Sequence, residues 1–538
     1  MSAIGGTWNL DGAAVDMGFM DAMMTDVSHR GQDGRGMWSN GSAALSHCLL
    51  ATTPEATKER QPLAMGSNVI AFDGRLDNRK ELIDQLRPAN KDCGDSELAL
   101  RAYERWGEQM PAHLIGDFAF ALWDEAKDQW LCARDHTGIK ILHYFFDGHT
   151  FIFGSEIKQL LRSPKVPRSL DMTQLGLFLS LRVGDGEQTF FNNIKRVPAG
   201  HSLIVRRSGI TSRAYWELDP TRKVRLASSE EYAEQFREIF QEAVRCRLRS
   251  VGPVGCMLSG GVDSPSVFAS ARQILQSDDV PGTDLHSFSW VFPNMPEMDE
   301  SKRIHQVIGE TTPQNHFING EDYWGMKPVS GHHVALDEPY TAPYEALLRA
   351  TFDEARSAGV RVLLTGQGGE LASVGIDYLL DLLTRFHWIE YRKTLSNESK
   401  RIKRIVFRRC MKQLLPDWAT RRLAHTEETT LPHWLNQEFL DGVDEYEARE
   451  NTIGNGKRLT REQRATYRAV AMAGMSPWTA WAEQTGSQFG LEMRHPFWDV
   501  RLIEFLASIP PKENFEVSWS KLILRRAMNG ILPEEVCW

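Results

Sequence analysis

The seven residues Leu258-Ser259-Gly260-Gly261-Val262-Asp263-Ser264 decide how the second half of this 538-residue chain folds. Small and apolar residues fill the run before them (251–258), and the run after them (265–275) is typical of a helix. The pattern predicts a buried strand, a tight glycine turn and a helix N-terminus. Unpaired backbone N–H groups at the positive end of a helix dipole bind phosphate oxygens. Asp263 would repel a bare phosphate, so it suits a metal ion that bridges the phosphates.

This loop differs from a Walker loop, in which a Lys follows the glycines. Its S-G-G-x-D-S string resembles the pyrophosphate loop of ATP pyrophosphatases, which split ATP into AMP and pyrophosphate. The resemblance implies that the residues from Leu258 to Ser264 hold ATP together with Mg²⁺. The alternative is a strand-to-helix turn whose glycines serve packing only.

The composition is that of a globular protein with more than one domain, with 42% hydrophobic and 25% charged residues. No apolar run is long enough to cross a bilayer and no signal peptide is visible, which predicts a cytoplasmic protein without a membrane partner. The net charge of −9 argues against nucleic acid as a partner. The seven cysteines form no close pair, so we expect neither a zinc site nor a disulfide framework.

Two domains are expected. Residues 1–210 contain short apolar runs separated by turns, which predicts stacked antiparallel sheets with flanking helices, one of them over 95–106. Residues 211–538 alternate strands with helices, which predicts a parallel sheet. We expect its further strands over 286–292, 314–318 and 360–364, helices over 229–250 (with Ser229 as N-cap), 300–309 and 347–358, and helices throughout 461–538.

A second glycine-rich loop, 365–371, follows the strand expected over 360–364. Ligands of parallel sheets bind at the carboxyl ends of the strands, so both loops should face one site. Val291, Thr365 and Gly366 complete the predicted nucleotide site. A turn without a ligand is the alternative here as well.

Several strings of the first domain resemble the glutaminase domain of asparagine synthetases. They are Met1-Ser2-Ala3-Ile4-Gly5-Gly6, Arg30-Gly31-Gln32-Asp33-Gly34, Gln61-Pro62-Leu63, Asp73-Gly74-Arg75-Leu76-Asp77-Asn78, Gly116-Asp117-Phe118-Ala119-Phe120, Ala133-Arg134-Asp135-His136 and Gly154-Ser155-Glu156-Ile157-Lys158. In that family a Cys after the initiator Met attacks glutamine. Here Ser2 takes its place, Leu49 replaces the Arg that binds glutamine, and Asp73 replaces the Asn. We therefore expect a degenerate domain that serves as a scaffold; the alternative is that Ser2 acts as an N-terminal nucleophile.

The resemblance extends over nearly the whole chain. It implies an α+β N-terminal domain of the glutaminase-like (Ntn-type) sandwich class, followed by an α/β parallel-sheet domain of the ATP pyrophosphatase-type synthetases. The second loop resembles the family's S-G-E-G-x-D-E loop, so Gln367 stands where the family has a Glu near the acyl-adenylate. Glu370 stands where an Asp helps to hold magnesium, and Asp263 and Glu370 are the predicted metal ligands. Gln367 and Lys521, the latter in a K-x-x-L-R string, are the predicted catalytic residues.

Three further features remain second-tier candidates. Asp299-Glu300 and Asp337-Glu338 match acidic pairs of the synthetase half, although solvated loops or helix caps are the commoner use of such pairs. The segment 385–422 holds twelve Lys or Arg residues against three acids. A solvated helix face is its default interpretation, and a docking surface for an acidic peptide or protein is the alternative. We expect its aromatic residues Trp388, Tyr391 and Phe407 to serve a helical core.

The strings Thr52-Thr53-Pro54-Glu55 and Glu59-Arg60-Gln61-Pro62-Leu63, together with 73–78, resemble those of lasso peptide cyclases within the same superfamily. The resemblance implies ATP-dependent closure of an isopeptide ring, in which an adenylated Asp or Glu side chain is attacked by the peptide's own N-terminal amine. It implies a precursor (core) peptide and leader-binding and leader-cleaving (leader-peptidase) proteins as partners. In the family, a Lys that steadies the pyrophosphate follows the L-P-x-x-V string seen at 532–536, and we expect it to be supplied differently or to lie beyond Trp538. An ammonia-using asparagine synthetase, a β-lactam synthetase-like ligase and a non-catalytic scaffold remain open.

Overall fold

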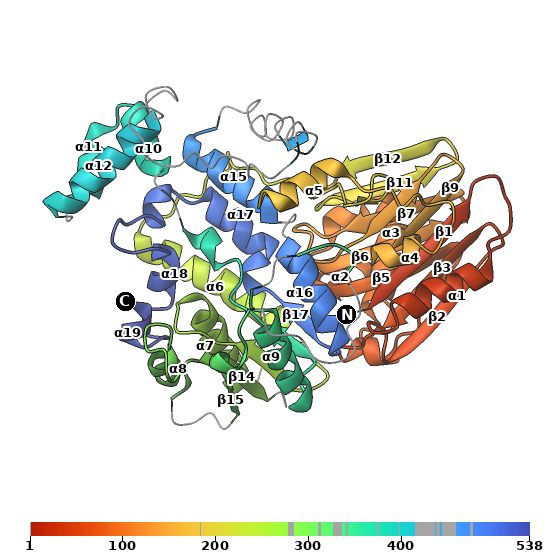
Figure 1. The fold of residues 1–538 in the computed structure, drawn as a ribbon, viewed down its shortest axis with the longest axis horizontal. Coiled ribbons are helices and arrows are strands. Elements are labelled where there is room, and N and C mark those ends of the chain that lie inside the picture. Colours follow the sequence, from red (N-terminus) through yellow and green to blue (C-terminus); the bar gives the residue numbers. More distant parts are fainter. Residues whose placement is uncertain are drawn as a thin grey trace.

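The structure is a computed structural model with two domains side by side (Figure 1). It describes residues 2–538 except 183, 185, 278–283, 310–313, 326–335, 341–342, 374, 376, 397–398, 415–435, 437–438, 440–441, 444–458 and 474–476. No helix among the described residues combines the length and apolar character needed to cross a membrane. All seven cysteines are unpaired, as expected from their scatter.

The first domain stacks two antiparallel six-stranded sheets, which confirms the predicted sandwich. One sheet has the order β10-β8-β9-β1-β3-β2 and the other the order β12-β11-β7-β6-β5-β4. Their strands are β1 (Ala3–Asn9), β2 (Gly34–Ser39), β3 (Ala43–Leu49), β4 (Leu63–Met65), β5 (Asn68–Leu76), β6 (Gly116–Asp124), β7 (Gln129–Arg134), β8 (His143–Phe146), β9 (Thr150–Gly154), β10 (Lys195–Arg196), β11 (His201–Arg206) and β12 (Gly209–Ala214). The helices around them are α1 (Met17–Asp26), α2 (Arg79–Leu86), α3 (Asp95–Trp106), α4 (Ile157–Leu160) and α5 (Met172–Leu179).

The alternating side chains of β5 show how the layers form. Val69 and Ala71 face the core between the sheets, where Trp8 and Trp123 meet edge to face at 5.2 Å. Ile70 and Phe72 point the other way, into the core under α3. Successive strand residues face opposite sides of a sheet, so a strand that is apolar on both faces must be covered on both.

The second domain contains the predicted parallel sheet, in the order β15-β14-β13-β16-β17. Its strands are β13 (Val254–Met257), β14 (Leu285–Val291), β15 (Asn315–Asn319), β16 (Val362–Leu364) and β17 (Glu492–Arg494). Its helices are α6 (Ser229–Arg247), α7 (Asp263–Gln276), α8 (Ser301–Ile308), α9 (Glu345–Ser357), α10 (Asp377–Thr384), α11 (Trp388–Thr394), α12 (Lys400–Leu414), α15 (Arg461–Ala473), α16 (Pro477–Gln488), α17 (Val500–Ser508), α18 (Leu522–Ala527) and α19 (Glu534–Cys537).

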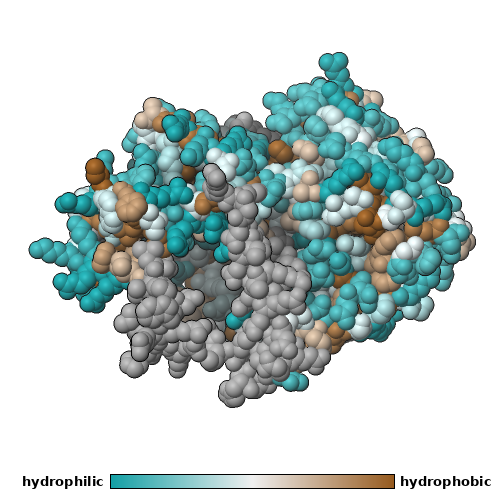
Figure 2. Space-filling view, turned by 90° about the horizontal axis from the view of Figure 1, so that it is seen from above, coloured by the Kyte–Doolittle hydropathy of each residue, from teal (hydrophilic) through white to brown (hydrophobic). Residues whose placement is uncertain are grey.

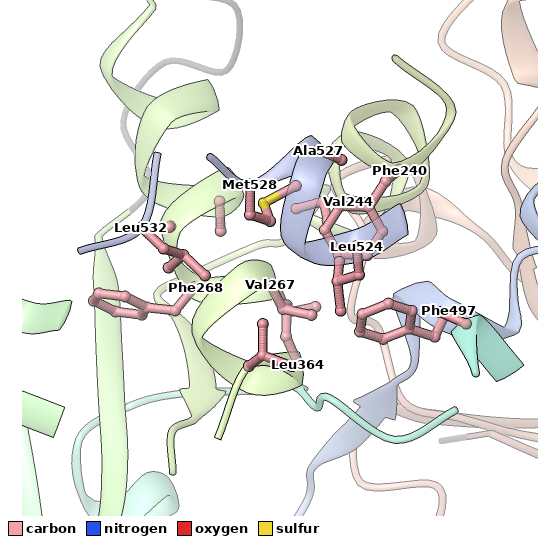
Figure 3. Close-up of a cluster of buried hydrophobic side chains, with 14 of the residues drawn as sticks. Phe240, Val244, Val267, Phe268, Leu364, Phe497, Leu524, Ala527, Met528 and Leu532 are labelled. Atoms are coloured by element: carbon pink, nitrogen blue, oxygen red, sulfur yellow. The ribbon is translucent and has the colours of Figure 1, made fainter. Parts of the chain in front are cut away.

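Helices cover both faces of this sheet. On one face, Val267 and Phe268 of α7 pack with Leu364 of β16 and Leu524 of α18 (Figure 3). On the other, Leu363 packs with side chains of α9 and α16. Burial on both faces explains why the strands read as continuous apolar runs.

Two predicted details are wrong. The N-cap of α6 is Ser228, whose side chain accepts a hydrogen bond from the Glu231 N–H, and Ser229 is the first helical residue. Residues 492–494, expected to be helical, form β17, which pairs in parallel with β16. A three-residue strand is too short to show a period of two, so only the sheet that it joins identifies it.

Buried ion pairs hold the two domains together. Arg247 of α6 bonds Asp499 at 2.8 Å and lies 3.5 Å from Asp117 of β6. Arg75 of β5 lies 2.8 Å from Asp117 and 3.5 Å from Glu492 of β17. These side chains are all buried, and charges removed from water are tolerated only when they are closely paired. The pairs therefore fix how the domains sit against each other.

Candidate functional site

The glycine-rich loop between β13 and α7 is closed by its own serines. The Ser259 N–H donates to the Ser264 hydroxyl at 3.0 Å, and the two hydroxyl oxygens are 2.9 Å apart. The turn itself, at Gly260 and Gly261, precedes α7, which begins at Asp263. The strand–turn–helix order predicted from the sequence is confirmed, with Leu258 and Val262 buried beneath the loop.

One backbone donor of this loop already holds a carboxylate. The Gly260 N–H donates to Glu300 Oε2 at 2.9 Å, and a Cβ at Gly260 would lie 2.8 Å from the Cβ of Glu300. The loop can therefore bind an oxyanion through its backbone. Asp299 has a different use, because it accepts the Phe292 N–H at 2.9 Å next to Val291, the last residue of β14. That hydrogen bond holds the pKa of Asp299 below its usual range.

The second glycine-rich loop packs directly against the first. A Cβ at Gly366 would lie 2.5 Å from the Ser264 nitrogen, and a Cβ at Gly369 would lie 2.3 Å from Asp263 Cγ. Only glycine permits such approaches. The structure thus brings the two predicted loops to one place at the carboxyl ends of β13 and β16.

Asp263 is the meeting point of three segments. Its Oδ2 accepts a hydrogen bond from Lys521 Nζ, and its Oδ1 is buried with no hydrogen-bond partner among the described residues. Lys521 precedes α18 and has the left-handed φ of 60°. A buried carboxylate oxygen that lacks a partner suits a cation, so the site fits the predicted magnesium.

Few other ligands are available for that metal. Glu370 follows Gly369 on the second loop and is exposed. No group of three or more His, Cys, Asp or Glu side chains that could hold a metal occurs among the described residues. Mg²⁺ is commonly held by one or two carboxylates together with phosphate oxygens, so Asp263 and Glu370 suffice only when a nucleotide is present.

Gln367 and Thr365 lie on the same loop. The Gln367 side-chain Oε1 is buried and lacks a hydrogen-bond partner among the described residues, while its backbone N–H donates to Thr365 Oγ1 at 3.3 Å. Thr365 Oγ1 lies 2.7 Å from Nδ1 of His495. Burial lowers the pKa of His495 to about 4, so this imidazole is neutral at pH 7. Sequence reasoning missed His495 as a loop support, because its contact joins residues 130 positions apart.

Comparison with known proteins decides the family. The model of the "Asparagine synthase" family matches residues 235–538, and that of the "Glutamine amidotransferase domain" matches residues 1–216. The chain belongs to the asparagine synthase family.

Some relatives match nearly the whole chain. "Asparagine synthetase [glutamine-hydrolyzing] 3" of Bacillus subtilis is 26% identical, and the match covers 96% of this chain and 82% of the Bacillus protein. "Amidase chyE" of Penicillium rubens is also 26% identical, with 95% and 82% covered. Among solved structures, a glutamine phosphoribosylpyrophosphate amidotransferase of B. subtilis matches 68% of this chain and 90% of its own, at 15% identity and a TM-score of 0.31. As a member of the asparagine synthase family, the chain is an ATP-dependent carbon–nitrogen ligase that forms AMP.

The amidotransferase half of this family member has almost no room for glutamine. The Ser2 hydroxyl accepts the Leu50 N–H at 3.1 Å, and Arg30 donates to the Ser2 carbonyl. The cavity beside Ser2, Leu49 and Asp73 measures about 20 Å³. One water needs roughly 10–15 Å³, so this space is close to that of a single water molecule.

Replacing Ser2 with alanine is therefore expected to leave product formation unchanged, because this hydroxyl only accepts a backbone hydrogen bond. The measurement is the rate of amide formation with ATP and a free amine, after mass spectrometry has shown that both proteins have the same N-terminus. Loss of product formation in the variant would instead identify Ser2 as a nucleophile.

The acidic pair 337–338 lies at the domain boundary. Asp337 accepts the Ile157 N–H at 2.6 Å. Glu338 accepts the Phe190 N–H at 3.0 Å and a hydrogen bond from Arg196. The pair thus binds the first domain.

The basic segment forms α11 and α12, which project from the body in Figure 1; its residues 415–422 lie outside the described part of the chain. The aromatic residues differ in environment. Tyr391 is buried as expected, but Trp388 is 51% and Phe407 49% exposed, so the expectation of a helical core is wrong for these two. The inner faces of α11 and α12 pack in one apolar cluster with α10, and the side chains of Trp388 and Phe407 lie outside that cluster. Figure 2 shows brown, hydrophobic atoms among teal ones on this lobe.

Proposed function

We propose that this protein activates a carboxylate with ATP and joins it to a free amine without hydrolysing glutamine. The observation that carries the proposal is the filled glutamine pocket beside Ser2, in a chain whose two adenylation loops still meet at Asp263. A ligase with an adenylation site but no room for glutamine must receive its amine directly.

The reaction has two steps. A carboxylate oxygen attacks the α-phosphorus of ATP and pyrophosphate leaves; the amine nitrogen then attacks the acyl carbon, AMP leaves, and the nitrogen loses a proton. The hydroxyls of Ser259 and Ser264 and the loop N–H groups stabilise the departing pyrophosphate. Magnesium, held by Asp263 and Glu370, neutralises phosphate charge when it is bound.

Lys521 and Gln367 have distinct roles in this proposal. The ammonium of Lys521, now paired with Asp263, is close enough to offset charge that develops on the phosphates. Gln367 carries a neutral amide and cannot take a proton. Its partnerless Oε1 instead accepts a hydrogen bond from the attacking amine and orients it.

The substrate class that we favour is a ribosomal precursor peptide. An Asp or Glu side chain of the peptide is adenylated, and its own N-terminal amine closes an isopeptide ring. The resemblance of 52–55, 59–63 and 73–78 to lasso peptide cyclases supports this, as does the loss of the glutamine site. Leader-binding and leader-cleaving proteins are then the expected partners.

A second candidate is an ammonia-dependent asparagine synthetase. It is favoured by the names of the relatives, several of which are asparagine synthetases. Those relatives are named as glutamine-hydrolysing, and in this chain ammonia itself would replace glutamine.

Pyrophosphate release and product mass separate these possibilities. The purified chain is given ATP and Mg²⁺ with either a leader-free core peptide or aspartate plus ammonium chloride. A peptide that loses one water in an ATP-dependent way establishes the cyclase, and asparagine formation establishes the second candidate. Turnover that depends on glutamine, with glutamate as a product, would contradict the proposal as a whole.

A further inference from the structure

A cavity of about 230 Å³ lies between the two domains. It is far larger than the roughly 10–15 Å³ that one water needs. The first domain contributes residues of β7, β8 and α5 and the pair 155–156, and the second contributes the segment 336–340 and residues of α16. The adenylation loops do not line this cavity, and neither do the residues around the small space beside Ser2.

The second-domain wall of this cavity is aromatic. The rings of Tyr340 and Trp481 stack at 5.1 Å. Both belong to the apolar cluster that contains Met257, the residue before Leu258 of the first loop. The aromatic wall therefore belongs to the apolar core on one face of the parallel sheet, and the strands of this sheet carry the adenylation loops.

Two buried polar atoms of the lining have no hydrogen-bond partner among the described residues: His143 Nε2 and Trp481 Nε1. His143 Nδ1 lies 3.2 Å from the Ser155 carbonyl, which can only accept, so Nδ1 carries the proton and Nε2 is an acceptor. Trp481 Nε1 is a donor. The lining thus offers one acceptor and one donor that have no hydrogen-bond partner among the described residues. Buried polar groups are rarely left in this state.

Three cations of the lining are already engaged. Arg30 binds Glu156 and the Ser2 carbonyl; Arg134 binds the carbonyls of Lys140, Val197 and Gly138; Arg196 binds Glu338 and the Gln188 carbonyl. A carboxylate ligand would find these guanidinium groups saturated.

Among the acids of the lining, Asp337 accepts the fewest hydrogen bonds from the described residues. It accepts one N–H, from Ile157, and its Oδ1 is 3.5 Å from Lys158 Nζ. Burial and the charge of Glu156 raise the pKa of Asp337 to about 7. An added cation beside it would relieve both effects.

We propose that this cavity binds the amine substrate, with a primary ammonium beside Asp337 and an apolar or aromatic body against Tyr340 and Trp481. This site rests on the proposed function, because it specifies which kind of free amine replaces glutamine as the nitrogen source. A bulky amine of this kind is the amino end of a peptide or of an amino acid, and ammonia alone would leave the aromatic wall unused.

Binding of L-phenylalaninamide to the full chain, measured by calorimetry without ATP, tests the site. We expect saturable binding, and none to N-acetyl-L-phenylalaninamide, which has the same body without the ammonium. Asp337→Asn keeps the acceptor for the Ile157 N–H but removes the charge, and should weaken binding at least about tenfold, as for a hydrogen bond to a charged group. Trp481→Leu should weaken it through the loss of the ring.

A matched control is Asp147→Asn, in the exposed turn between β8 and β9, which should bind as the wild type does. Thermal melts of all variants establish that they fold. Equal binding of the acetylated compound, or unchanged binding by both Asp337→Asn and Trp481→Leu, would overturn the site. Because the assay needs no ATP, a protein that binds the probe yet forms no amide would overturn the proposed function and leave the site standing.

Discussion

Replacing Asp263 with alanine is expected to lower ATP-dependent pyrophosphate release by at least about a hundredfold, the scale of removing one preorganised charge partner at a reacting group. Asp263 accepts the hydrogen bond of Lys521 and presents a second oxygen without a partner. Its loss removes the predicted metal ligand and the partner of that lysine together. The measurement is the initial rate of pyrophosphate release at saturating ATP and Mg²⁺.

Glu297→Ala is the matched control, because Glu297 is an exposed acid of the same domain, just before the pair 299–300. Its rate should equal that of the wild type. A normal rate for Asp263→Ala, with binding of ATP intact, would show that the loop is a structural turn and that adenylation takes place elsewhere.

Replacing Asp499 with alanine should destabilise the protein by about 3–5 kcal/mol, the usual cost of breaking a buried ion pair from one side. Asp499 accepts hydrogen bonds from Arg247 at 2.8 Å and from Arg501 at 2.8 Å. Arg247 is 1% exposed, so its charge would remain buried without this partner. The shift of the unfolding midpoint in urea, followed by fluorescence, measures the effect.

The surface pair between Arg222 and Glu504, 3.3 Å apart, supplies the comparison. Both side chains are well exposed, so Arg222→Ala should cost no more than about 1 kcal/mol. Equal shifts for the two variants would contradict the view that the buried ion pairs stabilise the fold more than exposed pairs do.

The same contact gives a pH dependence. Hydrogen bonds from Arg501 and the nearby charge of Arg247 outweigh the effect of burial and hold the pKa of Asp499 below its usual range. Its contribution to stability is therefore fully present above the ordinary carboxyl range, about pH 4, and is lost as the pH falls below it. The Asp499→Ala and wild-type midpoints should converge in acid.

Local sequence patterns were enough to predict the two glycine-rich loops, but not to predict which distant residues contact them. The strand before Ser259 and the helix after it follow from apolar runs and glycines, so the turn could be predicted from neighbours in sequence. Lys521 was picked out by its string, but its contact with Asp263 joins residues 258 positions apart. No periodicity reports such a contact, because it depends on how α18 packs against α6 and α7.

The glutamine pocket also could be predicted only in part from the sequence. Leu49 and Asp73 stand in the sequence where an Arg and an Asn are needed, and this indicated that glutamine is not bound. How small the remaining space is follows only from the packing of β3 and β5 around Ser2. The cavity between the domains likewise has no signature in the sequence, because its walls come from segments that lie far apart in the chain.

The pairing of Lys521 with Asp263 also sets when the protein can begin to work during its own synthesis. At the roughly 5–20 residues per second of a ribosome, the 258 residues between them take about 13 to 50 seconds to make. During that time the sandwich of the first domain can form at the exit tunnel. The contact between Asp263 and Lys521 cannot form until Lys521 has been synthesised. In the proposed mechanism, a nascent chain therefore gains its first structure before Lys521 can join the ATP site, and chains truncated before Lys521 would not release pyrophosphate.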